Sequence, residues 1–313
     1  MIGMIARRLI ATIPVLLVVA IVIFAVLRLT PGDPATLVAG DAATPEQIEA
    51  IRRAMGLDQP VIVQFGRWVG DMLRGDFGIS LISGKPVSEL IASRMGATVS
   101  LTIVTLLFTL LVSLPVGVLS AWYQGKALDR AVMAGSVVGF SVPVFIVAYL
   151  LILVFSIELR WLPVQGYKPL SAGLWEHLRH LILPAISLST VYIALITRIV
   201  RTSVIDTLGE DYIRTARAKG VPEWSVLSRH ALQNAAVPIL TIIGISITML
   251  IGGVVVTESV FNIPGLGRLV LDSVLSRDFT VIQTLIVLFS LAYILINLLI
   301  DISYTLVDPR IRS

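Results

Sequence analysis

The sequence predicts an all-α integral membrane protein with six transmembrane helices. Hydrophobic residues make up 56% of the 313-residue chain and charged residues 14%, and the mean hydropathy of +0.93 lies outside the range of soluble domains. Six stretches contain no charged side chain, and each is long enough, or nearly so, to cross about 30 Å of hydrocarbon at about 1.5 Å per residue. They cover residues 9–27, 95–125, 131–157, 181–197, 231–257 and 279–300. Six such runs buried in a soluble core would leave too little polar surface to cover that core.

Residues 1–29 form the first element, an N-terminal tail followed by the first transmembrane helix. Arg7 and Arg8 precede the apolar run, as basic residues do in a secretory signal peptide. A signal peptide has a shorter apolar core and a small-residue cleavage site, whereas here about nineteen apolar-rich residues continue to Arg28. We therefore predict an uncleaved signal anchor.

Residues 30–94 are predicted to form a helical external loop between the first two spans. The sequence PGDPA at 31–35 ends the first helix, because two prolines and a glycine force a turn. Thr44, Pro45 and Glu46 provide an N-cap, a proline at the first helical position and an acid in the first turn, so a helix should run to Gly56. A second amphipathic helix is expected over residues 61–73. The loop either caps the membrane bundle or receives an external partner.

Residues 95–313 are predicted to form a five-helix transmembrane core that contains one charged insert, residues 198–236, which we name the polar segment. Lys and Arg set the orientation of the spans. With the N-terminus inside, the cytoplasmic side carries twelve: Arg7, Arg8, Lys126, Arg130, Arg198, Arg201, Arg214, Arg217, Lys219, Arg229, Arg310 and Arg312. The opposite short loops carry five: Arg160, Lys168, Arg179, Arg268 and Arg277. Both termini and the polar segment are therefore predicted to be cytoplasmic.

The polar segment has the pattern of two short helices that meet at an angle. Residues 211–219 contain no helix breaker, Gly220 can adopt the positive φ that closes a helix, and Pro222 followed by Glu223 suits the first turn of another helix. Its mixture of small, apolar and basic side chains suits docking into a groove of a partner protein. An interfacial helix resting on anionic lipid would also favour the basic residues.

Catalytic chemistry finds little support in the sequence. The chain contains no cysteine, which excludes disulfides and thiolate metal sites. It also contains no GxxxxGK[ST] loop that could bind ATP. His177 and His180 beside Glu176 could hold a metal, but no second ligand cluster supports this, and we interpret them as interfacial histidines. An ion-coupled carrier, the main alternative, commonly keeps charges inside the membrane. Here the spans lack charge, and the nearest acids, Glu258 and Asp301, are expected at span ends where the interface solvates them.

The loop between the last two spans, residues 258–269, is apolar and contains helix breakers. Irregular backbone at membrane depth must be covered by protein or line an aqueous cavity. We expect Phe261, Asn262, Pro264 and Gly265 to help form an external gate, with simple packing in the bundle as the alternative. Polar candidates for the pore lie in the spans: Ser141, Tyr149, Ser187, Thr190, Thr248 and Asn297.

Several motifs together carry a resemblance to a known family. They are RRLIATIPVLL at 7–17, RLTPGDPA at 28–35, GLDQP at 56–60, GDFGIS at 75–80, WLPVQGY at 161–167, HLILPA at 180–185, DYIRTARAKG at 211–220, RHALQNAAVP at 229–238, FNIPGLGRL at 261–269 and DPRIR at 308–312. Each is unspecific alone, but their order resembles the first permease subunit of the dipeptide, oligopeptide, glutathione and nickel group of binding-protein-dependent ABC importers. The resemblance covers essentially the whole chain.

The resemblance implies the type I ABC importer permease fold, in a bacterial inner membrane, with no catalysis by this chain. In that family a short coupling helix inserts into a groove of the cytoplasmic ATPase. The matching positions are Asp211, Thr215, Ala216, Arg217, Lys219, Gly220, Val221, Pro222 and Glu223. The sequence Arg-Thr-Ala at 214–216 replaces the general importer's Glu-Ala-Ala, a departure that the peptide-type branch shares.

The implied partners are a second homologous permease, two cytoplasmic ATPase subunits that bind ATP and Mg, an external solute-binding protein and the lipid bilayer, with no nucleic acid. Dipeptides, short peptides and glutathione remain open as solutes, with nickel as a further member of the group.

Overall fold

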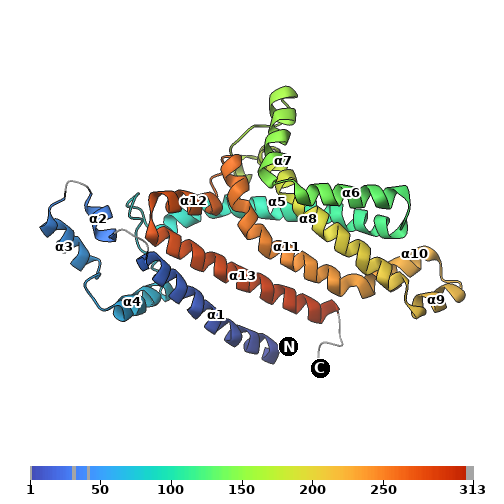
Figure 1. Ribbon diagram of the computed structural model, residues 1–313, viewed down its shortest axis with the longest axis horizontal. Coiled ribbons are helices and arrows are strands. Elements are labelled where there is room, and N and C mark those ends of the chain that lie inside the picture. The colour runs from blue at the N-terminus through green and yellow to red at the C-terminus, as the bar shows by residue number, and fades with distance from the viewer. Residues whose placement is uncertain (1, 30–32, 41–42, 308–313) are drawn as a thin grey trace. The chain divides into compact units, whose positions relative to one another are not determined.

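Helices form nearly all the regular structure in the computed structural model, which describes residues 2–29, 33–40 and 43–307 (Figure 1). The α-helices are α1 Ile2–Leu29, α2 Pro34–Ala39, α3 Pro45–Ala54, α4 Val61–Leu73, α5 Val87–Trp122, α6 Ala127–Ser141, α7 Val144–Leu151, α8 Leu174–Leu208, α9 Asp211–Ala218, α10 Glu223–Ser225, α11 Leu232–Val260, α12 Leu266–Ser276 and α13 Phe279–Val307. Two π-helices, η1 Ile152–Glu158 and η3 Val226–Ala231, and the 3-10 helix η2 Leu170–Ala172 complete the order. Among the described residues the only β-type pairing is one bridge between Ile79 and Pro86.

Four helical segments in the described chain are long and apolar enough to cross a membrane: Val87–Trp122, Leu174–Leu208, Glu223–Val260 and Phe279–Ser303. The third apolar stretch of the sequence is not one straight helix, because α6 and the α7–η1 segment are bent by 102°. Val142 lies in the bend with extended backbone (φ −85°, ψ 124°), as expected for a residue that precedes a proline. If this pair is one broken span, the number of spans is five, and α1 adds the shorter apolar stretch Ile10–Val26.

Contacts divide the chain into two compact units, the first of which contains residues 1–96 and 268–294. Sequence signals for helices are confirmed here: Thr44 and Gln47 form a reciprocal capping box at α3, and α4 spans residues 61–73 as predicted. The PGDPA turn is only partly described, since Pro31 and Gly32 lie outside the described residues, but Asp33 caps the short helix α2.

An aromatic contact and a buried carboxylate are among the contacts that attach the predicted external loop within this unit. Phe24 of α1 packs edge-on against Phe65 of α4, with ring centroids 5.2 Å apart. Asp278, only 3% exposed, accepts hydrogen bonds from Ser80 Oγ (2.5 Å) and from the Leu81 backbone N–H (3.2 Å). Asp278 directly precedes α13, so one buried carboxylate holds the loop to the start of a membrane helix.

The second unit contains residues 97–267 and 295–313, and α8 is its central helix. It packs against α11, α6 and α7. One apolar cluster surrounds Leu188 and Leu250, and a second contains Val200, Leu227 and Ala235, which lie in the polar segment. The second cluster therefore joins α8 to η3 and α11.

Candidate functional site: the polar segment

Helix α9 forms the exposed end of the polar segment, and one side chain anchors it. Ile213 is fully buried and is the only buried residue of this eight-residue helix. Tyr212 adds a long hydrogen bond from its hydroxyl to the His230 carbonyl oxygen (3.4 Å). Partial burial, and then the negative charge of Glu210, raise the pKa of the Tyr212 phenol. A phenol is protonated at neutral pH even at its ordinary pKa of about 10, so Tyr212 can donate this hydrogen bond.

Gly220 closes α9 as the sequence predicts. Its φ is +77°, its N–H donates to the Arg217 carbonyl (2.9 Å), and the Val221 N–H donates to the Ala216 carbonyl (3.2 Å). These two bonds form a Schellman motif, which requires a left-handed residue at this position. A sharp corner follows α9 as a result.

The second helix of the predicted pair differs from the expectation. Pro222 occupies the N-cap of α10 and not its first helical position, and α10 continues through η3 into α11. The polar segment thus contains the end of α8, the short helix α9 and the start of a long membrane helix. No sequence signal announces this continuity, because the charged residues up to Arg229 resemble a surface helix.

Arg217 and Glu223 bond to each other across the corner. Arg217 Nε lies 2.8 Å from Glu223 Oε1 and Nη2 lies 3.2 Å from Oε2, with both side chains about half exposed. Asp211 and Arg214 form a second, more exposed pair at 2.9 Å. The sequence analysis interpreted Arg217 as a charge available to a partner protein. In the structure Arg217 already forms an ion pair with Glu223 of the same chain.

The structure brings the nine predicted coupling residues together on this corner. Ala216 and Val221 are partly exposed, and the remaining seven are exposed: Asp211, Thr215, Arg217, Lys219, Gly220, Pro222 and Glu223. Trp224, which follows them, is 76% exposed. Tryptophan and arginine are enriched at protein–protein interfaces, so this composition is compatible with docking.

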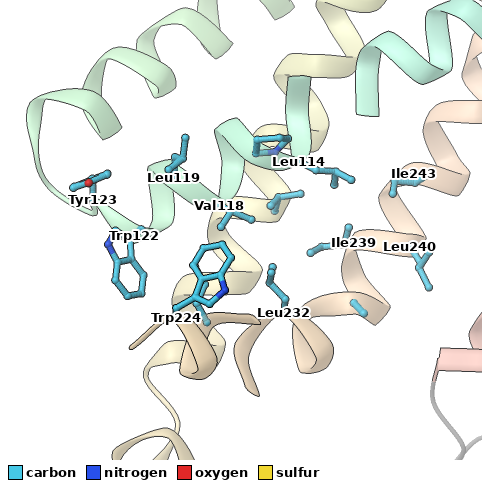
Figure 2. Close-up of a pocket in the computed structure, with 14 residues that line it drawn as sticks. Leu114, Val118, Leu119, Trp122, Tyr123, Trp224, Leu232, Ile239, Leu240 and Ile243 are labelled. Atoms are coloured by element: carbon cyan, nitrogen blue, oxygen red, sulfur yellow. The ribbon is translucent and has the colours of Figure 1, made fainter. Parts of the chain in front are cut away.

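An apolar cavity of about 780 Å³ lies beside this corner (Figure 2). Figure 2 shows Leu114, Val118 and Leu119 of α5 on one side and Ile239, Leu240 and Ile243 of α11 on the other. Trp122, Tyr123 and Trp224 also line it. Solute sites carry a few placed polar groups that orient the ligand, and this wall offers almost none, so we do not assign it to the solute pathway.

The predicted gate residues lie in a tightly folded turn. Phe261 is 1% exposed and its carbonyl accepts a hydrogen bond from the Gly166 N–H (2.9 Å), while Gly265 is buried. Asn262, with φ +52°, and Pro264 are exposed. Burial of Phe261 within its own subunit accords with the packing alternative, and a role in gating stays a prediction.

One sequence interpretation is wrong: Glu258 is not solvated at a span end. Its exposure is 0%, and Thr98 Oγ1 donates to its Oε1 at 2.6 Å. Gly265 lies so close that a Cβ built on it would be 2.0 Å from Glu258 Oε1. The turn folds back over the carboxylate, which only a glycine at this position permits.

The two histidines of α8 differ from the interfacial interpretation in one respect. His177 is 5% exposed, its Nδ1 lies 2.7 Å from the Lys168 carbonyl oxygen, and its ring meets the Tyr167 ring edge-on. His180 Nδ1 lies 2.7 Å from the Glu176 carbonyl oxygen. These bonds hold His177 as a buried structural residue.

Comparison with known proteins decides the family. Residues 113–313 match the model of the binding-protein-dependent transport system inner membrane component, and residues 1–102 match the N-terminal model of such membrane components. The chain belongs to this permease family. It is therefore a multi-pass inner-membrane permease subunit of a binding-protein-dependent transport system, and the resemblance drawn from its motifs is confirmed.

Curated relatives align with the permease over nearly its whole length. A probable peptide ABC transporter permease, y4tP of Sinorhizobium fredii, is 52% identical and covers 98% of both chains. The glutathione transport system permease GsiC of Salmonella paratyphi A is 44% identical over 100% of this chain and 99% of its own. A putative peptide transport system permease of Brucella abortus is 43% identical over the same shares. No comparison supports the ion-coupled carrier considered above.

Among solved structures, the permease resembles an inward-facing form of the MetNI methionine ABC transporter. The TM-score is 0.58 at 21% identity, covering 70% of this chain and 96% of that one. A second crystal form gives a TM-score of 0.59. At this identity the match supports the fold alone.

Proposed function

We propose that this permease forms, with a second and homologous permease, the pathway of an ABC importer for dipeptides, oligopeptides or glutathione. The names of the relatives support these solute classes, since two are peptide permeases and one is a glutathione permease. In this proposal ATP and Mg bind to two separate ATPase subunits, and an external solute-binding protein delivers the solute. The chain itself performs no catalysis.

The exposed α9 corner is the observation that carries the proposal. Its docking residues are Asp211, Thr215, Ala216, Arg217, Lys219, Gly220, Val221, Pro222 and Glu223. A single buried anchor, Ile213, and the Schellman closure present this short helix in one conformation before any partner binds. A pre-organised helix loses little conformational freedom on docking, which favours insertion into a groove of an ATPase.

Sidedness completes the proposal. We place six spans in the bilayer, with α1 as the first and the bent α6–α7 pair as the third, and both termini in the cytoplasm. The excess of Lys and Arg on the side of the polar segment supports this orientation. The loop at residues 30–94 then lies outside the membrane, where Ile62 (81% exposed) and Leu73 (84% exposed) of α4 offer apolar surface to the solute-binding protein. We also propose that Phe261, Asn262, Pro264 and Gly265 form an external gate.

Copurification of the ATPase with Gly220 variants tests the docking proposal. In Gly220→Pro the ring fixes φ near −65° and removes the N–H that donates to Arg217, so the corner cannot form. We expect the variant to insert in the membrane normally and to lose most of the copurifying ATPase. Gly220→Asn is the matched control, because Asn tolerates positive φ and no atom lies within 4 Å of the added Cβ. Undiminished ATPase with Gly220→Pro would refute docking at this corner.

A further inference from the structure

Asp129 lies buried in the first turn of α6 and receives hydrogen bonds from three separate parts of the chain. Its side chain contacts Ser120 Oγ of α5 at 2.6 Å, the Gly125 backbone N–H at 2.8 Å, and Arg201 of α8 through Nε at 2.5 Å and Nη2 at 2.8 Å. The residue is 3% exposed. A carboxylate with four donors, two of them from one guanidinium, is fully satisfied and fixed in orientation.

Arg201 occupies a particular place along α8. It follows the apolar part of the helix and lies seven residues before α8 ends at Leu208, a rise of about 10 Å along the helix. Val200 and Val204 on either side of it are fully buried. The ion pair between Asp129 and Arg201 thus lies at the end of the apolar part of α8, on the side that leads to α9.

Helices α5 and α8 approach each other closely next to Arg201. A Cβ added to Gly117 of α5 would lie 2.7 Å from Val200 Cβ, so the two helices touch at backbone distance. Ser120, one turn further along α5, bonds to Asp129. The α5–α6 connection and α8 are therefore joined both by packing and by charge.

Stability alone is a poor reason for such an arrangement. Buried ion pairs often stabilise a fold no more than apolar residues of the same volume, while the bidentate geometry strongly restricts relative orientation. Two helices that must move together require a fixed relative orientation more than they require added stability.

We propose that Asp129 and Arg201 are positioning residues that make α8 and the α5–α6 connection move as one body when the ATPase displaces α9. This inference rests on the proposed docking of an ATPase at the α9 corner. With the pair intact, a displacement received by α8 reaches α6. Without it, α8 shifts and α6 does not follow.

Spin-label distances test the inference, and the absence of cysteine from this chain permits labels at chosen positions. The labels replace the exposed residues Thr202 on α8 and Val138 on α6, in the full transporter with the accessible cysteines of its other subunits replaced. In the native chain we expect the distance between the two labels to be the same with and without ATP and vanadate. In Asp129→Asn the distance should change on addition of ATP and vanadate by about 2 Å or more, the size of helix shifts in switching proteins.

Two further variants separate transmission from folding. Arg201→Lys keeps the charge but not the bidentate fork, so it should give a smaller nucleotide-dependent change, and it carries the test if Asp129→Asn does not fold. Glu176→Gln breaks a partly exposed ion pair with Arg179 at the far end of α8 and should behave as native. A purely structural role would alter the distance equally with and without nucleotide.

Native ATPase copurification is measured first, since its absence would overturn the proposed docking and this inference together. Normal copurification with distances in both Asp129→Asn and Arg201→Lys that do not respond to nucleotide would overturn the inference alone.

Discussion

Replacing Ile213 by alanine should release α9 from the body of the permease. Ile213 is the one buried residue of this helix, and an eight-residue helix has little stability of its own in water. Truncating a buried isoleucine to alanine costs about 2–5 kcal/mol. At about 1.4 kcal/mol per factor of ten, local opening of α9 should become about 30- to 4,000-fold more frequent.

Amide hydrogen exchange followed by mass spectrometry, with the permease in lipid nanodiscs, measures this opening directly. Peptides that cover residues 213–220 should lose protection in Ile213→Ala, while peptides from α3 should not change. Ile213→Val is the graded control, since its cost of about 0.5–1.5 kcal/mol predicts only about a 2- to 12-fold effect. A change in α9 protection below about twofold in the alanine variant would show that burial of this side chain does not hold the helix.

Two other substitutions follow from close contacts. Gly265→Ala places a methyl group against a buried carboxylate and should lower thermal stability by about 1–3 kcal/mol, whereas Gly252→Ala, with no atom within 4 Å, should be neutral in the same unfolding assay. Equal stability of the two variants would contradict the packing described for the turn. Asp278→Asn weakens the attachment of the external loop and should speed proteolytic cleavage near Leu81 several-fold, while Asp58→Asn on the exposed surface should not. Unchanged cleavage rates would mean that the loop is held elsewhere.

Local signals in the sequence were sufficient where one turn of backbone decides the structure. The N-cap at Thr44, the closure at Gly220 and the amphipathic helix over residues 61–73 all appear as predicted, because each depends on residues within a few positions of one another. The bend before Pro143 belongs to the same class. That signal was present in the sequence, but the length and apolarity of residues 131–157 concealed it.

Burial of charge could not be predicted in this way. Glu258 follows a long apolar run and looked solvated, but Thr98 and the glycine-containing turn enclose it. In the sequence, Arg201 counted only as one of the cytoplasmic basic residues and Asp129 carried no signal. The two residues are 72 positions apart in the chain, yet they form an ion pair in which Asp129 is buried.

By itself, the sequence determined that this protein is a helical membrane protein and that a short helix lies in its polar segment, because hydropathy and capping act over short distances along the chain. Only the tertiary structure decided which charges are buried, that Arg217 forms an ion pair with Glu223, and that Asp129 of α6 bonds to both α5 and α8. Those features depend on distant segments meeting in space, and the free energy of a charge depends on what surrounds it.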